Sequence, residues 1–547
     1  MKRRSFLLAA AVPAAAQTRL VTSGQSFPDL LREPDRVTVF SNLASLRLER
    51  AASRWTAAGI EVSTELKQST HGPELGISLT APATPIGRVH LRWNASVPEN
   101  WRYLGDHWER SYGDLEWRGL VGERLMPWYF LASDGHSTRG YGVKTGASAI
   151  CYWQVDAGGA SLWLDVHNGG SDVVLGDRRL DAATVVSSEG SGRAICKRMC
   201  EHPRLPAAPV YGSNNWYYTY GINCSADGIV RDCELLAELA PPGGNRPFMV
   251  IDMGWAAGPE GAGPVEQLAT SFPDMKDLAS RMKGLGVRPG IWVRPLLSVD
   301  RSLPTSWHLP PAVFGGSLKD PMFVLDPTVP EALEYVEKSL GTLHGWGYEL
   351  IKHDFSTYDL TGRWGFQMGP ELTSPGWRFH DGSRTTAEII SELYRALRRG
   401  AKDSLLLGCN TIGHLGAGLF EVQRIGDDTS GREWSRTRKM GVNTLAFRMP
   451  QHNTFFDADA DCVPVTKDVP WKLTKQWLDL VARSGTALFV SADPESTGSM
   501  EREALKSAFA QASRPLPSGE PLDWMATTTP EHWRLNGAVT NFRWYDE

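Results

Sequence analysis

The sequence lacks several features that would assign a chemistry at once. Its 547 residues contain no Gly-x-Gly-x-x-Gly fingerprint, no phosphate-binding loop and no His-Glu-x-x-His motif, so no nucleotide site or zinc protease site is indicated. The seven cysteines show no zinc-type spacing, and their odd number leaves at least one unpaired. The net charge is −5 and no basic stripe occurs beyond the N-terminus, which excludes nucleic acid as the expected partner. We therefore expect no cofactor and no metal.

Long hydrophobic runs are also missing. The apolar run that begins near Ser5 is well short of the ~20 residues that span a bilayer, so no membrane partner is expected. It follows Lys2-Arg3-Arg4 and ends at Ala14-Ala15-Ala16, which is the pattern of a charged n-region, an h-region and a small-residue cleavage site. Paired arginines followed by Ser-Phe-Leu resemble a bacterial twin-arginine signal. Residues 1–16 are predicted to be a signal peptide, and the protein is predicted to be exported, periplasmic or secreted.

The rest of the composition is that of a globular protein with an ample core. Hydrophobic residues make up 41% of the chain, and its length suggests two or three domains. Residues 18–205 show short alternating segments punctuated by Gly, Asn and Asp, which predicts a β-sandwich. After Pro206 the sequence pattern changes, and short apolar runs alternate with helical stretches, as in a parallel sheet. We expect a barrel over 206–500 and a short C-terminal segment over 501–547, too short for a large domain but compatible with the start of a small β domain.

The alternating region predicts a (β/α)8 TIM barrel, since eight βα units fit into its roughly 290 residues. The predicted helices cover 226–240, 274–284, 330–344 and 387–399. The predicted strands begin at Val210 and continue at 248–252, at 290–294, in a run that ends at Asp354, and at 404–410, 422–425, 444–447 and 486–490.

Two of these strands end on an acid beside a base. The segment from Tyr348 to Asp354 stops on Lys352-x-Asp354, and the segment from Phe420 stops on Arg424-x-x-Asp427-Asp428. The carboxyl ends of the strands are where such barrels build their active sites. Two carboxylates that face one another across a sugar are the usual apparatus for cleaving a glycosidic bond. A single Lys–Asp pair is more often an ordinary ion pair, but two such acid–base sites in one βα repeat indicate a catalytic site.

Two further segments allow two interpretations each. Residues 101–117, dense in aromatic and charged side chains, are either a loop that reaches toward a sugar site or a surface turn with buried Trp anchors. Asp457-Ala458-Asp459-Ala460-Asp461 resembles the opening of a calcium loop, but position six is Cys462 and position twelve is Asp468. A role as a barrel loop near strand seven is the better interpretation of the second segment.

Six stretches in order resemble glycoside hydrolase clan D, in particular the retaining α-galactosidase families 36 and 27. They cover most of 206–495, and a β-sandwich before the barrel is also like the layout of family 36. The six stretches are Ile251-Asp252-x-Gly254-Trp255, Phe272-Pro273-Asp274-Met275-Lys276, Gly290-Ile291-Trp292-Val293, Leu325-Asp326-Pro327, Ile351-Lys352-His353-Asp354-Phe355 and Arg424-Ile425-Gly426-Asp427-Asp428-Thr429. The resemblance implies an exo-acting retaining glycosidase, a carbohydrate substrate and a homo-oligomer.

Carried over residue by residue, the resemblance makes Asp354 the nucleophile and Asp428 the general acid/base, with Asp427 as the rival for the second role. Lys352 would keep Asp354 ionised, and a raised pKa would let the acid/base hold its proton. The resemblance assigns substrate contacts to the other polar and aromatic residues at the strand ends, which are Asp252, Trp216, Trp255, Trp292, Lys352, Asn410, Arg424 and Asp427.

Met253 departs from the family, which usually has a second aspartate before Gly-Trp. A thioether cannot replace the charged hydrogen bonds of a carboxylate, each worth roughly 1.5–3 kcal/mol. Galactose, N-acetylgalactosamine and a pentopyranose such as β-L-arabinopyranose therefore all remain candidate sugars. A carbohydrate-binding or transfer protein with weakened hydrolysis is the alternative of a different class.

Overall fold

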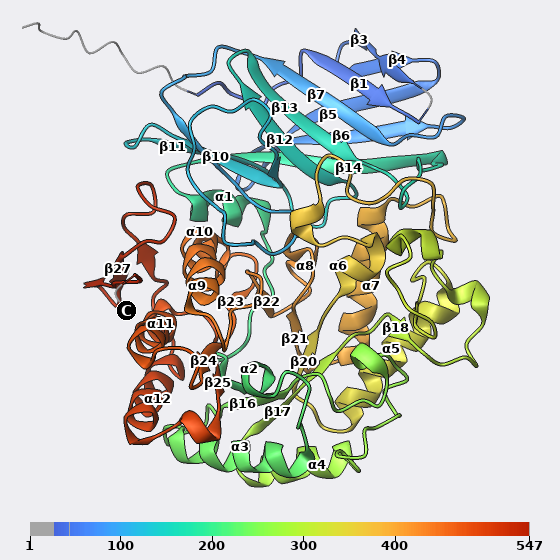
Figure 1. Cartoon of the computed structure of the whole chain (residues 1–547). Coiled ribbons are helices and arrows are strands. Elements are labelled where there is room, and N and C mark those ends of the chain that lie inside the picture. The colour runs from blue at the N-terminus through green and yellow to red at the C-terminus, as the bar shows by residue number, and fades with distance from the viewer. Residues whose placement is uncertain (1–26, 43, 546–547) are drawn as a thin grey trace, which may run out of the picture.

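The computed structural model describes residues 27–42 and 44–545. Within this range the chain forms a β-sandwich stacked on a curled α/β barrel, with a small sheet beside the barrel at the C-terminal end (Figure 1). The predicted signal peptide, residues 1–16, lies outside the described residues. No helix in the described ranges combines the length and the apolar character needed to cross a bilayer.

The sandwich consists of two antiparallel sheets. Their strands alternate buried and partly exposed positions, as β7 does, because one face of each sheet packs on the other. The first sheet has the order β2 (Ser45–Arg47), β1 (Arg36–Phe40), β7 (Arg88–Asn94), β13 (Gly159–Asp165), β12 (Ile150–Asp156) and β9 (Met126–Pro127). The second has the order β3 (Glu49–Ala51), β4 (Arg54–Ala57), β5 (Ile60–Ser69), β6 (Gly72–Ala81), β14 (Gly176–Glu189), β11 (Thr138–Val143), β10 (Tyr129–Ser133) and β8 (Arg102–Gly105). Helix α1 (Gly192–Met199) then leads toward the barrel (Figure 1).

The barrel is a sheet of nine parallel strands in which consecutive βα units are neighbours. A parallel bridge between Asp459 and Ala487 joins the edge strand β23 to the residue before β25, so the sheet closes on itself. In sheet order the strands are β23 (Asp457–Asp459), β22 (Val422–Arg424), β21 (Leu405–Gly408), β20 (Leu350–His353), β17 (Arg288–Val293), β16 (Phe248–Ile251), β15 (Tyr211–Asn214), β25 (Leu488–Ala492) and β24 (Val463–Val465). The predicted fold class, a β-sandwich followed by a TIM-type barrel, is confirmed.

Amphipathic helices cover the outside of the barrel (Figure 1). Helix α7 is typical: Thr385 caps its N-terminus, Glu388 completes the capping box, and its buried side includes Ile389, Leu393 and Leu397. The covering helices include α3 (Ala226–Leu239), α4 (Met275–Gly284), α5 (Pro330–Gly345), α7 (Thr386–Ala401), α11 (Trp471–Ser484) and α12 (Ser499–Ala512). The four helices predicted from the sequence are confirmed to within two residues at each end.

The prediction of the seventh strand at 444–447 is wrong. These residues form helix α10 (Thr444–Arg448), and the seventh position is filled by the two short strands β23 and β24, which pair with β22 and β25. A short apolar run cannot be assigned to a buried helix or to a strand by periodicity alone. The true strand was not predicted because it carries acidic residues. In the structure, Asp457 accepts a hydrogen bond from the Ala487 amide, and burial raises the pKa of Asp459 to about 6.

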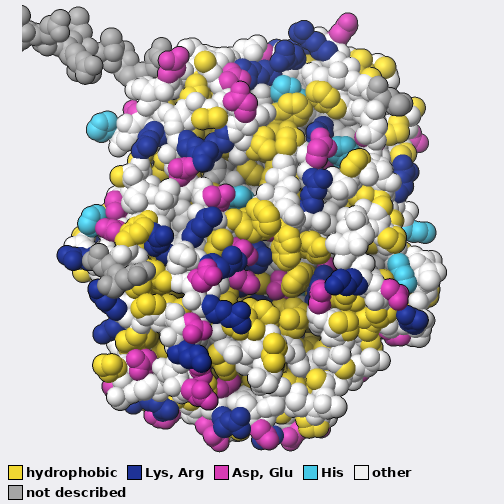
Figure 2. Space-filling view, in the orientation of Figure 1, with side chains coloured by type: hydrophobic (Ala, Val, Ile, Leu, Met, Phe, Trp, Pro, Cys, Tyr) yellow, Lys and Arg dark blue, Asp and Glu magenta, His cyan; other side chains and the backbone are white. Residues whose placement is uncertain are grey.

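The C-terminal residues extend the barrel and add a small sheet. Helix α12 packs against α11 and α3, and β26 (Glu520–Pro521), β27 (His532–Leu535) and β28 (Ala538–Asn541) form a three-stranded antiparallel sheet. Trp533 and Trp544 are fully buried in this region, and Trp544 accepts a hydrogen bond through its carbonyl from the Trp434 indole. On the face drawn in Figure 2, basic and acidic side chains are interspersed, without a continuous stripe of one sign.

Candidate active site

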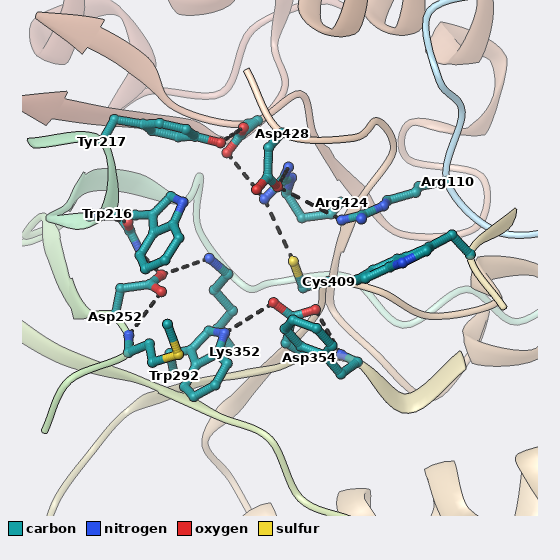
Figure 3. A pocket seen from close by; sticks show the side chains of 15 residues that line it. Arg110, Trp216, Tyr217, Asp252, Trp292, Lys352, Asp354, Cys409, Arg424 and Asp428 are labelled. Atoms are coloured by element: carbon teal, nitrogen blue, oxygen red, sulfur yellow. Dashed lines mark hydrogen bonds and ion pairs between the residues drawn. The ribbon is translucent and has the colours of Figure 1, made fainter. Parts of the chain in front are cut away.

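The carboxyl ends of the barrel strands surround a cavity of about 100 Å³. Side chains from strand ends on all sides converge on it, and Figure 3 shows Asp252 and Lys352 on one side and Arg110 on the other, with Asp354 and Asp428 between them. The residues that line the cavity are Arg110, Asn214, Trp216, Tyr217, Asp252, Met253, Trp292, Lys352, Asp354, Phe355, Trp364, Cys409, Arg424, Asp428 and Asp461.

Asp354 follows β20 directly and is held by three hydrogen bonds. Its Oδ1 accepts from the backbone amides of Phe355 (2.7 Å) and Asn410 (3.0 Å), and its Oδ2 accepts from the Trp292 indole (3.0 Å). Phe355 has a φ of +64°, which is unusual for a residue with a side chain and is compatible with its amide turning back onto the carboxylate. The carboxylate is therefore fixed at the end of the strand with its orientation set by the backbone.

The surroundings of Asp354 favour its ionised form. Burial by itself would raise the pKa of this carboxyl, but the charges of Lys352 and Arg110 and the Trp292 hydrogen bond outweigh burial, so the pKa lies below the ordinary value. A carboxylate that stays ionised in a cavity is suited to act as a nucleophile.

Lys352 forms a buried ion pair with Asp252 at the floor of the cavity. Its Nζ lies 2.8 Å from Asp252 Oδ2, the same oxygen that accepts a hydrogen bond from Asn214 Nδ2 at 2.7 Å. Lys352 and Asp354 alternate along one strand end, so both side chains point to the barrel interior. The pair places one cation and one anion where the hydroxyl groups of a bound polyol would need a donor and an acceptor.

Asp428 reaches the cavity from the end of β22 and is paired with Arg424. Arg424 Nη2 donates to Asp428 Oδ1 at 3.0 Å, while Nη1 lies 3.1 Å from Asp461 Oδ1. Asp461 is itself fixed, because its Oδ2 accepts hydrogen bonds from the Tyr217 hydroxyl and from the Thr429 amide. Arg424 is thus shared between a structural carboxylate and one that is 39% exposed toward the cavity.

The structure contradicts the expectation of a raised pKa at the acid/base. Burial acts to raise the pKa of Asp428, but Arg424, Arg110 and Lys352 all lower it, and the net shift is below the ordinary value. The sequence showed only one of these three cations beside Asp428, which is why the prediction had the wrong sign. The surrounding cations therefore favour the ionised form of Asp428, which is the form of a general base.

Asp427 does not line the cavity. Its two oxygens are held by Arg110 Nη2 at 2.9 Å and by Arg436 Nη2 at 2.8 Å. Of the two adjacent aspartates, only Asp428 faces the cavity.

The sandwich contributes one segment to the site, residues 109–112. Glu109 is fully buried and accepts hydrogen bonds from Tyr112, the Gly365 amide and Asn410 Nδ2, and burial raises its pKa. Arg110 lines the cavity itself. Residues 101–117 therefore combine both interpretations of the sequence, since Trp101, Trp108 and Trp117 are buried anchors and Arg110 reaches the site.

Two of the three predicted site tryptophans line the cavity. Trp216 and Trp292 do so, whereas Trp255 is buried behind Trp292 and donates to its carbonyl oxygen at 2.8 Å. Asn410 lies outside the lining as well and acts by holding Asp354 and Glu109.

Sequence reasoning assigned no role in the site to seven of the lining residues, which are Arg110, Asn214, Tyr217, Phe355, Trp364, Cys409 and Asp461. The clearest available signal was the unusual density of aromatic and charged residues around Arg110. Cys409 directly precedes the predicted Asn410, and Asp461 lies in the acidic run that resembled a calcium loop. Among the described residues no group of three or more His, Cys, Asp or Glu side chains is arranged to hold a metal ion.

Comparison with solved structures identifies α-galactosidases with the same fold. An α-galactosidase from Thermus thermophilus, solved with p-nitrophenyl α-D-galactopyranoside, has a TM-score of 0.61 and 16% identity, over 92% of this chain and 98% of that one. A family 36 enzyme from Geobacillus stearothermophilus, in complex with 1-deoxygalactonojirimycin, has a TM-score of 0.56 and 14% identity, over 84% and 68%. An α-galactosidase from Lactobacillus brevis has a TM-score of 0.56 and 14% identity, over 89% and 74%.

No family model and no curated relative matches the sequence. At identities of 13–16% the structural likeness shows a common fold. The chemistry of the cavity must carry any statement on function.

Proposed function

We propose that the protein is a retaining exo-α-glycosidase of the α-galactosidase type, which acts by double displacement on terminal α-linked galactose or a related sugar. The observation that carries the proposal is the meeting of Asp354 and Asp428 in one cavity at the carboxyl end of the barrel, beside the Lys352–Asp252 pair. The α-galactosidases that share the fold support it.

In the first step the Asp354 carboxylate attacks the anomeric carbon, and the bond to the leaving group breaks. Asp428 first takes up a proton from solvent and then gives it to the departing oxygen, which leaves a covalent glycosyl–enzyme and an ionised Asp428. In the second step that carboxylate takes a proton from water, the water oxygen bonds to the anomeric carbon, and Asp354 is released. Two inversions leave the configuration of the sugar unchanged.

The remaining cavity residues would hold the sugar. Lys352 donates and Asp252 accepts, so together they suit neighbouring hydroxyl groups. Arg424, shared between Asp461 and Asp428, lines the cavity and would contact the sugar from there. Trp216 and Trp292 provide the apolar walls against which a pyranose ring packs.

Met253 lines the same cavity beside Asp252 and favours a second group of sugars. An apolar side chain there offers no charged acceptor to the adjacent edge of the ring. We therefore propose N-acetylgalactosamine and β-L-arabinopyranose as alternative sugars at the same scaffold. Met253 also favours, as a further alternative, a weakly hydrolytic binding or transfer protein on the same barrel. The sequence of residues 1–16 leads us to propose export to the periplasm or the medium.

The proposed function is tested by replacing the nucleophile, Asp354. Asp354→Asn should abolish turnover of an aryl α-glycoside while the fold, followed by circular dichroism, is retained. Asp354→Ala with added azide should regain some activity, because azide attacks the vacant face and yields a glycosyl azide of inverted configuration. For the wild-type protein, proton NMR of the first product should show retained anomeric configuration. An Asp354→Asn protein with full turnover would end the assignment.

A further inference from the structure

The sandwich holds the backbone that carries the two adjacent aspartates. Ser111 forms a parallel bridge with Gly426: its amide donates to the Ile425 carbonyl at 3.0 Å, and its carbonyl accepts from the Asp427 amide at 2.9 Å. Arg448 strengthens the contact by donating to both the Ile425 and the Glu109 carbonyls. The orientation of Asp427 and Asp428 is therefore set by a segment from another domain.

Arg110 sits in that segment between the two aspartates. Its side chain is 7% exposed, and Nη2 binds Asp427 Oδ1 at 2.9 Å. Nη1 stands 3.8 Å from Asp428 Oδ1, too far for a hydrogen bond, and within the described structure Nε has no hydrogen-bond partner. Figure 3 shows the guanidinium directed at Asp428 from the side of the cavity opposite Asp252.

We propose that Arg110 is the positioning residue of the acid/base pair. By binding Asp427 it leaves Asp428 as the carboxylate that faces the cavity, and by facing Asp428 across 3.8 Å it favours the ionised form that the second half-reaction needs. The inference rests on the proposed glycosidase function and names the residue that controls when Asp428 gains and loses its proton.

The geometry separates Arg110 from Arg424. Arg424 hydrogen-bonds to Asp428 and is held as well by Asp461, so its charge is shared between two carboxylates. Arg110 makes no hydrogen bond to Asp428, so its effect on Asp428 is a Coulombic attraction. Throughout both steps the guanidinium keeps its proton, and the only proton exchanged is that of Asp428.

Other charged groups also act on Asp428 and are common to all variants tested below. They are Arg424 from β22, which Asp461 also binds, Lys352 and Asp354 from the end of β20, and the titratable hydroxyls of Tyr217 and Tyr220 from the first loop of the barrel. Because these groups are the same in every variant, replacing Arg110 removes one charge that lies 3.8 Å from Asp428, and replacing Asp427 removes the partner of that charge.

The test is the dependence of kcat/KM on pH for the methyl α-glycoside of the preferred sugar, whose leaving group needs protonation. Its alkaline limb reports the loss of the Asp428 proton in the free enzyme. Arg110→Gln should move that limb to higher pH by about one unit, the low end of the effect of a charge within 4–6 Å, because Asp428 is partly exposed. Arg110→Lys keeps the charge and should leave the limb near its wild-type position.

Asp427→Asn should move the same limb in the opposite direction. Removing the anion frees the full charge of Arg110 for Asp428 and removes a neighbouring negative charge, and both changes favour ionisation. Opposite shifts from the two members of one ion pair are not expected from loss of packing. Arg118 lies eight residues after Arg110, outside the segment, and its side chain is 52% exposed. Arg118→Gln is the matched control and should leave the profile unchanged.

The outcomes distinguish the inference from the function on which it rests. An active wild-type protein whose limb stays in place in Arg110→Gln, or moves the same way in Arg110→Gln and Asp427→Asn, overturns the role of Arg110 and leaves the glycosidase intact. If Arg110→Gln does not fold, Arg110→Lys and Asp427→Asn still test the role of Arg110. Arg110→Lys must leave the alkaline limb at its wild-type pH, and Asp427→Asn must move that limb to lower pH. A wild-type protein without activity on any of the candidate glycosides removes the function and the inference together.

Discussion

Replacing Lys352 with Met should destabilise the barrel and raise the pH at which the enzyme becomes active. The substitution keeps the length of the side chain but removes the ammonium group that lies 2.8 Å from Asp252 Oδ2. Asp252 is then left in the cavity floor with the Asn214 amide and its own neighbouring backbone as hydrogen-bond donors. Its charge is no longer compensated.

The size of the effect follows from the separation and burial of the pair. Two unit charges at 2.8 Å attract by about 6 kcal/mol at an effective dielectric constant of 20. The side chains are 10% and 5% exposed, so part of this attraction offsets the desolvation that folding imposes on both. Removing one partner of such a buried pair costs about 3–5 kcal/mol, because the other stays buried and charged. Lys352→Met with Asp252→Asn should cost less than Lys352→Met alone.

The assay is equilibrium urea unfolding of the wild type, both single variants and the double variant, with equal m-values required for comparison. A double variant that is no more stable than Lys352→Met would refute the reasoning, because it would show that the charge left on Asp252 is not the cost. A second readout uses Asp354, whose pKa is lowered by Lys352 more than by any other charge. The acidic limb of kcat/KM against pH should therefore move to higher pH in Lys352→Met.

Two further predictions concern the cavity. Asp428→Ala should slow the hydrolysis of glycosides with poor leaving groups far more than that of activated aryl glycosides, since only the former need protonation. Asp427→Ala should not show this pattern, and the reverse result would exchange the roles of the two residues. Met253→Asp should raise kcat/KM for an α-galactoside by roughly 10-fold or more if the second carboxylate makes a charged hydrogen bond worth about 1.5–3 kcal/mol, and should lower it for the preferred sugar. A wild-type kcat/KM on plain α-galactosides already within about 10⁴–10⁸ M⁻¹s⁻¹ would instead show that Met253 marks no change of specificity.

Local patterns in the sequence were enough to place most of the barrel. Strand β20 begins with the apolar residues Leu350 and Ile351 and ends on Lys352 and His353, and helix α7 has a capping box and an amphipathic face, so both could be predicted from neighbours in the chain. The same local reasoning placed Asp354 and Asp428 at strand ends, because the direction of a parallel strand fixes which end carries the site.

Strand seven was beyond such reasoning. Its acids are tolerated because of partners far away in the sequence: Asp457 is bonded to Ala487, and Asp461, just after β23, is paired with Arg424 and Tyr217. Each of these partners comes from a different βα unit. No window of sequence contains them together, so the acids indicated a loop.

The sequence alone therefore determined the order of the domains, the positions of most strands and helices, and the two carboxylates, because each of these depends on residues that are near neighbours in the chain. The resemblance had already preferred Asp428 to Asp427, but only the tertiary structure decided which charges surround Asp428 and how its proton is held. Arg110 reaches Asp428 across more than three hundred residues of sequence, and Lys352 and Arg424 approach it from different strands. The pKa of a buried group depends on all charges within a few ångströms, and that neighbourhood exists only after the sandwich and the barrel have come together.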